Sequence, residues 1–234
     1  MNTLHWLLAA TLFGGAAVPA RGAIAAAFAA PPPSRPGVVM LPRPALNGRL
    51  SFEKTLSQRR SIREYAHGAL TLAELGQLAW AAQGITGPEG KRTAPSARAV
   101  YPLTVYFVAN DVADFAKGVY RYEPGGHALA LVAAGDHVPA LSAATSREAF
   151  IAPAPLLVVV AADSVLAAEK FGARAERWCA METGFVVQDV YLQATALGLG
   201  TVMIGGFDDA ALRRAIELPA NQLPYALMPV GRKK

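Results

Sequence analysis

The sequence is poor in the residues that form disulfides and bind metals. Of its 234 residues, only Cys179 is a cysteine and only four are histidines. A single cysteine excludes an internal disulfide framework and a zinc site built from several thiolates. The histidines have no spacing typical of metal ligands, so we expect no bound metal.

Charged residues are also scarce, at 17% of the chain, while 53% of the residues are hydrophobic. A chain of this composition and length readily buries the core of one ordinary domain. The net charge of +5 comes from scattered lysines and arginines with two tight clusters, at 59–63 and 232–234. A nucleic-acid surface needs a longer basic stripe with interleaved aromatic residues. We therefore expect no nucleic-acid partner, and two local clusters suit a small anion better.

The N-terminal region differs in composition from the rest. Residues 4–20 are apolar and small residues follow up to Ala23, which is typical of a signal peptide over 1–23. No basic residue precedes the apolar run, so an uncleaved membrane anchor and a misassigned start are alternatives. Residues 24–50 are rich in alanine and proline and predict an extended linker. We expect a periplasmic or secreted protein with its folded domain over 51–234.

Hydrophobic periodicity predicts several helices. The clearest one begins at Thr71, which forms a capping box with Glu74, and ends at Gly84. A longer helix over 176–198 is expected to lie buried at the centre of the domain. Its expected core face comprises Ala180, Gly184, Val187, Tyr191 and Ala194.

Alternating and β-branched segments predict the strands. Two strands flank a turn at 124–126, and the continuous apolar run over 154–163 predicts a strand buried on both faces. Further strands are expected over 101–109 and near the C-terminus. Together with the helices, they predict an α+β domain in which helices pack around one central sheet.

Three motifs with known chemistry fail on closer comparison. The stretch GITGPEGKRT resembles a phosphate-binding P-loop, but its spacing is one residue too long and Arg92 stands where magnesium needs a hydroxyl. The run GLGTVMIGG follows a helix rather than a strand, unlike a dinucleotide-binding fingerprint. Cys179 lies in an apolar helical segment, so we interpret it as a core residue rather than a nucleophile.

The segment SQRRSIREY concentrates positive charge in front of an apolar helix. Arginine guanidinium groups and a serine hydroxyl together can form a phosphate site. In an extended chain, Arg59, Ser61 and Arg63 project to one side and Arg60 to the other. The alternative is a solvated basic turn, which the spacing alone favours. The cluster at 232–234 ends a predicted strand and could close on the same anion.

Taken together, the segments resemble the FMN-dependent nitroreductase superfamily. The resemblance spans residues 51–232, and within the superfamily it is strongest to the SagB/ThcOx-type dehydrogenase branch. It implies a homodimer with a nitroreductase-like α+β fold, a mixed but mainly antiparallel central sheet, and FMN at the subunit interface. The segments that carry it are, in order, RRSIREY, LTLAELGQLAWAAQGIT, RTAPSARAVYPLTVYFV, GVYRYEP, KFGARAERW, ETGFVVQDVYLQATALGLGTVMIGGFDDAALRRAIEL and ALMPVGR.

The resemblance also implies roles for individual residues. Arg59, Arg60, Ser61 and Arg63 match the N-terminal flavin-binding segment. Arg59 and Ser61 would serve the phosphate and ribityl end, and Arg63 the N1/O2 edge of the ring, where a cation favours hydride acceptance. Further implied flavin contacts are the loop Pro95, Ser96 and Ala97, the glycine pair Gly205 and Gly206, and the basic residue Arg232 at the phosphate, assisted by Lys233.

The sequence departs from the family pattern at several positions. Azoline-oxidising members have Lys-Tyr-Gly where this chain has Lys170-Phe171-Gly172, so the phenol is missing and Lys170 is the candidate catalytic residue. Arg98 stands where glycine is common, and Asp189 where asparagine is usual.

The implied function is an FMN-dependent oxidoreductase that moves hydride through flavin N5 in a ping-pong cycle. The reductant would be NAD(P)H or the substrate itself, and the small-molecule substrate a nitroaromatic, a quinone or an azoline-type compound. The alternative is a catalytically lapsed flavin-binding protein of the same fold that acts as a binding or scaffold module.

Overall fold

A computed structural model describes residues 37–145 and 148–234, which form an α+β domain on one eight-stranded sheet. The strands are β1 (Val38–Met40), β2 (Tyr65–Ala66), β3 (Leu103–Ala109), β4 (Gly118–Glu123), β5 (Ala128–Ala134), β6 (Leu156–Asp163), β7 (Leu199–Thr201) and β8 (Gln222–Lys233). Their order is β1-β5-β4-β3-β6-β8-β2, and β7 pairs with the end of β8. All these pairings are antiparallel. The predicted fold class is confirmed.

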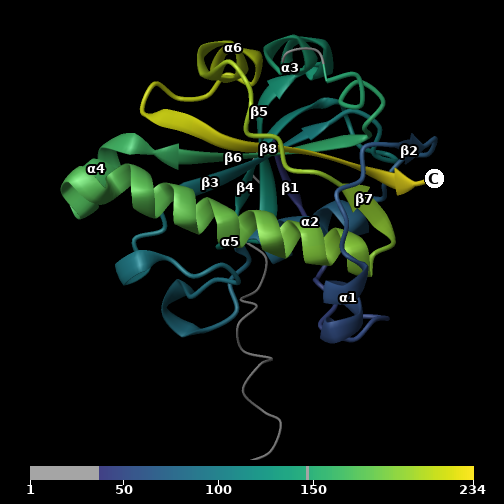
Figure 1. Ribbon diagram of the computed structural model, residues 1–234, viewed down its shortest axis with the longest axis horizontal. Coiled ribbons are helices and arrows are strands. Elements are labelled where there is room, and N and C mark those ends of the chain that lie inside the picture. The colour runs from purple at the N-terminus through teal and green to yellow at the C-terminus, as the bar shows by residue number, and fades with distance from the viewer. Residues whose placement is uncertain (1–36, 146–147) are drawn as a thin grey trace, which may run out of the picture.

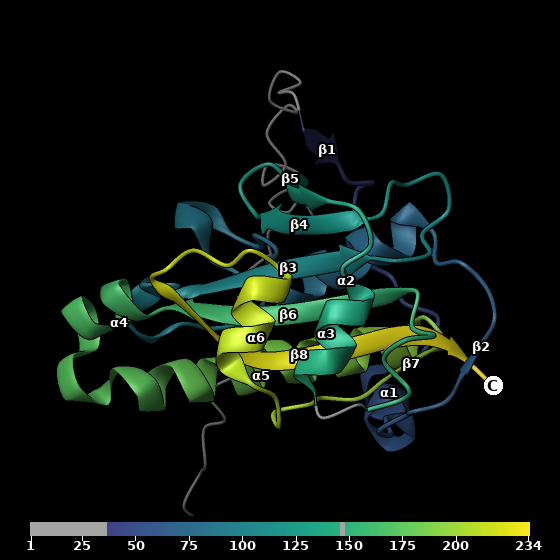
Figure 2. The same ribbon diagram turned by 90° about the horizontal axis from the view of Figure 1, so that it is seen from above.

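Helices cover both faces of the sheet, α2 and the long α5 on one face and α3 and α6 on the other (Figures 1 and 2). Each face has its own apolar core, and the two cores are separated by the sheet. The helices are α1 (Phe52–Gln58), α2 (Leu72–Gln83), α3 (Val138–Ala144), α4 (Ser164–Phe171), α5 (Ala175–Ala196) and α6 (Asp209–Ala215).

Strand β6 shows why the sheet occupies the centre. It lies between β3 and β8, and its residues 156–162 are all buried. Successive side chains point to opposite faces. Val158 therefore belongs to the core under α5, and Val159 to the core under α3 and α6. A strand buried on both faces was predicted from its continuous apolar run.

Part of the segment expected to be a linker belongs to the domain. Strand β1 pairs with β5, and the following Leu41 is buried. The His127 Nε2–H donates to the carbonyl of Pro42 over 2.9 Å, and Tyr122 donates its hydroxyl to Nδ1. Burial lowers the pKa of His127, which favours this neutral form. The residues Val38–Met40 are free of proline, so their amides can join the sheet where the proline-rich stretch could not.

The signal peptide expected over 1–23 and the linker up to residue 36 lie outside the described residues. From residue 37 onward, leaving out 146–147, no helix is long and apolar enough to cross a membrane.

Helix α5 is buried along one face rather than all round. Val187, Tyr191 and Ala194 face the core as predicted, whereas Ala180 and Gly184 are exposed. The prediction was wrong for these two because small residues occur equally well on a core face and on an exposed one. The buried face is formed by Cys179, Glu182, Thr183, Val186, Val187, Val190, Tyr191, Ala194 and Thr195.

Candidate functional site

The arginine-rich segment after α1 is fixed against the end of the sheet. The N–H of Ile62 donates to the carbonyl of Thr201 over 2.9 Å. Gly200 permits this close approach, because a Cβ there would lie 2.6 Å from the Ile62 side chain. Strand β2 then pairs with the end of β8, with Tyr65 opposite Lys233. The 59–63 segment and the C-terminus therefore lie side by side, as Figures 1 and 2 show.

The side chain of Tyr191 in α5 contacts polar groups of this segment. The Arg59 guanidinium carbon lies 5.1 Å from the centroid of the Tyr191 ring, and the Ser61 hydroxyl lies 3.2 Å from the phenol oxygen. The same phenol accepts the N–H of Met203 over 2.7 Å. Tyr191 is 8% exposed. Sequence analysis placed it only in the core, although a buried phenol needs a hydrogen-bond partner, which was the available signal.

The other two arginines of the segment diverge. The Arg63 guanidinium carbon lies 6.0 Å from the centroid of the Phe150 ring. Arg60 folds back, and its Nη1 donates to the carbonyls of Ser57 and Arg59 over 3.2 and 2.7 Å. It therefore points away from Ser61, as expected for an extended segment. Within the described ranges, neither Arg59 nor Arg63 has a carboxylate partner. Their charge is left available for an anion.

The glycine pair lies two residues beyond Met203 and is exposed. A Cβ on Gly206 would meet nothing within 4 Å, and one on Gly205 would meet only the flexible end of Met203, at 3.4 Å. Neither glycine has a positive φ. The packing of the chain itself therefore does not require glycine here. The open backbone suits the close approach of a flat ligand.

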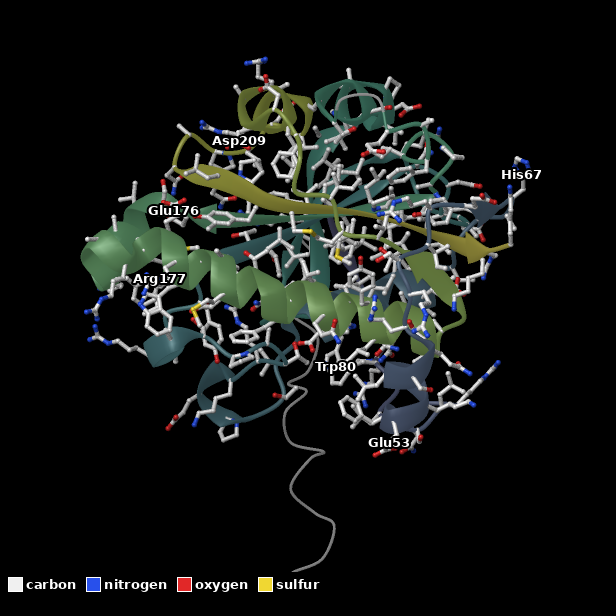
Figure 3. The ribbon with its side chains drawn as sticks, viewed as in Figure 1. Glu53, His67, Trp80, Glu176, Arg177 and Asp209 are labelled. Atoms are coloured by element: carbon white, nitrogen blue, oxygen red, sulfur yellow. The ribbon has the colours of Figure 1, made fainter. Side chains whose placement is uncertain are left out.

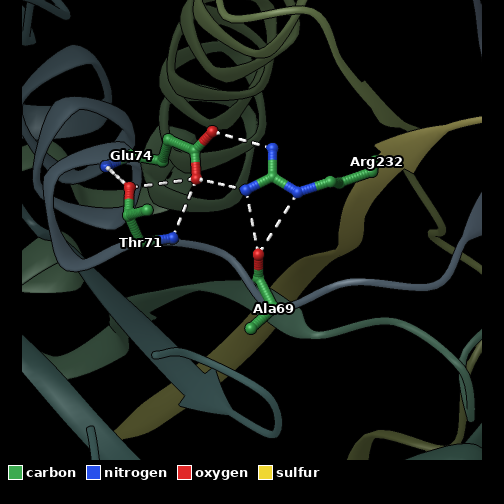
Figure 4. A network of polar contacts seen from close by, with 4 residues as sticks. All are labelled: Ala69, Thr71, Glu74 and Arg232. Atoms are coloured by element: carbon green, nitrogen blue, oxygen red, sulfur yellow. Dashed lines mark hydrogen bonds and ion pairs between the residues drawn. The ribbon is translucent and has the colours of Figure 1, made fainter. Parts of the chain in front are cut away.

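Arg232 does not take the position expected for a phosphate ligand (Figure 4). Its Nη1 and Nη2 donate to the two carboxylate oxygens of Glu74, each over 3.0 Å. Its Nε and Nη2 donate to the carbonyl of Ala69 over 3.2 and 2.9 Å. Burial alone would raise the pKa of Glu74, but hydrogen bonds from Arg232 and Thr71 outweigh it and lower the pKa. The guanidinium thus anchors the capping box of α2.

Lys233, unlike Arg232, is a C-terminal cation without a carboxylate partner in the described ranges, and it projects to the α3/α6 side of the sheet, away from Tyr191. Successive residues of a strand project to opposite sides, so Lys233 points away from Glu74. It is exposed and, among the residues that the structure describes, has no hydrogen-bond or ion-pair partner. Sequence analysis could not foresee this, because the competing carboxylate comes from a distant helix.

The second part of the site is the loop 95–101, here called the anchored loop. Glu182 of α5 accepts the N–H of Ala97 over 2.8 Å and the hydroxyl of Ser96. Ser96 Oγ in turn accepts the N–H of Tyr101 over 2.8 Å. Glu182 is 3% exposed, and its burial raises the pKa of the carboxyl group. A glutamate on the core-facing side of a helix was the signal that sequence analysis overlooked.

The anchored loop and the Tyr191 cluster are separate within one chain. Glu182 and Tyr191 are nine residues apart on α5, which is roughly 13 Å along the helix. The structure therefore brings Arg59, Ser61 and the glycine pair together, but leaves residues 95–97 at the other end of the helix.

Lys170 belongs to the anchored-loop end. Its Nζ contacts Glu169 Oε1 at 2.6 Å, and its carbonyl accepts from Nη1 of Arg98 over 3.4 Å. Phe171 packs against Trp178 with ring centroids 6.2 Å apart. This position has no phenol for proton transfer.

A cavity of about 310 Å³ opens between α1, α2 and α5, beside the Tyr191 cluster. Phe52, Trp80 and Asp189 are among its lining residues, and Trp80 lies next to α1 in Figure 3. The buried Nε1 of Trp80 has no partner in the described part of the chain, and neither has the Asp189 carboxylate. Burial raises the pKa of Asp189 to about 6.

Asp189→Asn is expected to stabilise the protein above pH 6. The folded-state pKa is raised from 3.8 to about 6, so charged Asp189 opposes folding, and wild-type stability falls as pH rises through this window. After allowing for partial exposure, we expect a gain of about 1 kcal/mol at pH 7 and none near pH 3. Urea unfolding at both pH values measures it. An equal effect at both would contradict the assigned cause.

Tyr191→Phe is expected to lower the free energy of unfolding by about 1–2 kcal/mol, because the Met203 N–H loses its acceptor. Tyr106→Phe is a matched control, since its hydroxyl donates to the side chain of Gln222 over 2.8 Å and its ring belongs to the core on the other face of the sheet. Both variants should lose stability in urea unfolding. If the account is right, only Tyr191→Phe also weakens FMN binding in a fluorescence titration.

Comparisons with known proteins identify the family of the chain. The model of the nitroreductase family matches residues 56–232. A protein of Methanocaldococcus jannaschii, described as a candidate nitroreductase, is 41% identical over 184 residues, covering 79% of this chain and 92% of that protein.

Solved structures of other proteins have a similar fold. A candidate nitroreductase of Ralstonia eutropha JMP134 superimposes with a TM-score of 0.75 at 30% identity, covering 85% of this chain and 90% of the other. The Escherichia coli microcin synthetase McbBCD complex contains a chain with a TM-score of 0.65 at 21% identity, covering 84% and 78%. The second likeness shows the fold alone. On the family match and the close relatives, this chain belongs to the nitroreductase family.

Proposed function

We propose that the chain is an FMN-dependent oxidoreductase that moves hydride through flavin N5 by a ping-pong cycle. Membership in the nitroreductase family indicates a flavin oxidoreductase. The observation that carries the proposal is the Tyr191 cluster, where unpaired arginine charge, a serine hydroxyl and an open glycine pair converge.

The residues of this cluster fit the parts of FMN. Arg59 is a cation without a carboxylate partner in the described ranges, and both Arg59 and the Ser61 hydroxyl lie against Tyr191. A guanidinium group beside a hydroxyl suits a phosphate. The open backbone of Gly205 and Gly206 suits the ring.

When bound, FMN would supply a two-electron carrier between donor and acceptor. Arg63 is assigned to the polar edge of the ring, where its charge favours the reduced, more negative form. Tyr191 positions Arg59 and Ser61, and its hydrogen bond to Met203 fixes the approach to the glycine pair.

We further propose that the active species is a homodimer in which the anchored loop completes the flavin site of the partner. Large apolar side chains are exposed on α5 and α1, with Phe185 at 43% and Phe52 at 63%. Such a surface favours a subunit interface. Because the loop lies far along α5 from Tyr191, a second copy could bring its loop to the cluster.

The direct experiment is the absorbance spectrum of the purified protein after incubation with FMN, followed by reduction with NADH or NADPH. We expect oxidised-flavin bands at roughly 370 and 450 nm that bleach on reduction and return with an acceptor. Absence of bound flavin would refute the proposal. Bound flavin that no reductant and acceptor can cycle would favour the alternative, a catalytically lapsed flavin-binding module.

Membership in the SagB/ThcOx-type branch, with azoline-type substrates and Lys170 as an acid–base residue, is a narrower proposal. Lys170 lies beside the anchored loop, which supports it, while Phe171 lacks the phenol of that branch. Export to the periplasm or secretion is likewise proposed only from the sequence of residues 1–23.

A further inference from the structure

Basic side chains gather at the end of α5 where the loop is anchored. Arg98 belongs to the anchored loop, Lys170 lies near the end of α4, and Arg174 and Arg177 lie at the start of α5. All four are exposed. The hydrogen bond from Arg98 to the carbonyl of Lys170 ties the loop to α4. Figure 3 shows Arg177 at this end of the helix.

The positive charge here is only partly compensated. Three carboxylates are nearby; Glu169 is paired with Lys170, and Glu182 accepts the Ala97 N–H and the Ser96 hydroxyl. The third, Glu176, is exposed on α5. Over residues 37–145 and 148–234, no carboxylate lies in ion-pair contact with any of the remaining three arginines. These arginines, Arg98, Arg174 and Arg177, are called the cationic subsite.

The backbone at Arg98 is unusual for such a residue. Its φ of 55° and ψ of 20° lie in the left-handed region, and Ala99 and Tyr101 also have positive φ. Glycine would adopt this conformation without steric cost. The loop therefore holds Arg98 in a conformation that glycine would adopt more readily, next to the hydrogen bond between Ala97 and Glu182.

Two aromatic rings belong to the same stretch of chain as Arg174 and Arg177. Phe171 and Trp178 are half-buried, with ring planes inclined by 42°. In the sequence they enclose Arg174 and Arg177. Aromatic side chains and guanidinium groups on one stretch of chain suit a planar compound that carries a negative charge.

We propose that the cationic subsite binds the phosphate or carboxylate of the small molecule that exchanges hydride with the flavin. The inference rests on the proposed function, in which the anchored loop lines the flavin of the partner subunit. The subsite would then lie at the entrance to the ring and select anionic over neutral compounds.

The kinetic test compares matched acceptors and donors. Para-nitrobenzoate and para-nitrobenzyl alcohol differ in charge, and NADPH differs from NADH by one phosphate. Arg98→Gly, which relieves the backbone, is expected to lower the kcat/KM ratio of the charged to the neutral compound about tenfold for at least one pair. Arg177→Ser should lower the same ratio. An effect on the nitrobenzoate pair identifies a carboxylate as the bound anion, and an effect on the NADPH pair identifies a phosphate.

Arg214→Ser changes an exposed arginine of α6 on the opposite face of the sheet. It is the matched control and should leave both ratios unchanged.

Equal ratios in wild type and Arg98→Gly would overturn the subsite while leaving the proposed function intact. Where the protein binds no flavin or does not turn over, the proposed function fails, and calorimetric titration with benzoate decides on the subsite alone. Binding that is weakened about tenfold in Arg98→Gly supports it. Benzoate that does not bind to wild type, or binds equally to both, refutes it.

Discussion

Replacing Arg59 with alanine is expected to weaken FMN binding by about 10- to 100-fold. The guanidinium has no carboxylate partner in the described parts of the chain, so its charge is available to the phosphate. A hydrogen bond to a charged group contributes about 1.5–3 kcal/mol, which corresponds to this range. Quenching of FMN fluorescence on titration with the flavin-free protein measures the dissociation constant.

Arg60→Ala is the matched control, because the two arginines are adjacent and carry the same charge. Arg60 donates only to the carbonyls of Ser57 and Arg59. We expect its dissociation constant to stay within about threefold of wild type, since it contributes only a screened, distant charge. Equal losses in both variants would mean that general charge, and not the Arg59 position, retains the flavin.

Glu182→Ala is expected to lower the free energy of unfolding by about 3 kcal/mol. The change removes the acceptor of the Ala97 N–H and the Ser96 hydroxyl and leaves a hole beside buried Cys179. Each unsatisfied buried group costs about 1–3 kcal/mol, and the cavity adds to it. Urea unfolding measures the loss, and hydrogen exchange at Ala97 and Tyr101 should report a loosened loop.

Two further variants separate the stability lost with these hydrogen bonds from the effect of any substitution in α5. Glu182→Gln keeps an acceptor and the side-chain volume, so its loss should be about 1 kcal/mol. Gln188→Ala changes an exposed residue of the same helix and should stay within about 0.5 kcal/mol of wild type. If Glu182→Ala is as stable as Gln188→Ala, the carboxylate does not anchor the loop.

Local signals predicted much of the fold. The capping box of Thr71 and Glu74 and the stop at Gly84 were identified correctly, because helix ends depend on neighbouring residues. The turn between β4 and β5 and the buried strand β6 followed from short-range patterns in the same way. The neighbourhood of 59–63 and the C-terminus was also anticipated, and β2 pairs with β8 there.

The side-chain partners in the site were harder to predict because they join distant elements. Arg232 was assigned to the phosphate, yet it meets Glu74, 158 residues away in sequence. Lys233 next to it is free of this contact, a distinction set by which side of β8 each residue faces. Composition alone could not reveal that part of the presumed linker forms β1.

Buried polar side chains were the least visible feature in the sequence. Tyr191 and Glu182 occupy the core face of α5, where hydrophobic periodicity predicts only core packing. Their hydroxyl and carboxylate need partners once buried, and those partners turn out to be the two segments that form the site. Asking what each buried polar group must bind would have located both.

Hybrid dimers test most directly whether the flavin site joins the Tyr191 cluster of one chain to the anchored loop of the other. One chain carries Arg59→Ala, and the second carries Pro95→Glu at an exposed position of the loop. Each variant alone should bind FMN weakly. The hybrid should regain one tight site per dimer, because one of its two sites then has both intact halves. A hybrid with no tight site, or a Pro95→Glu homodimer that binds FMN as wild type does, would contradict the account.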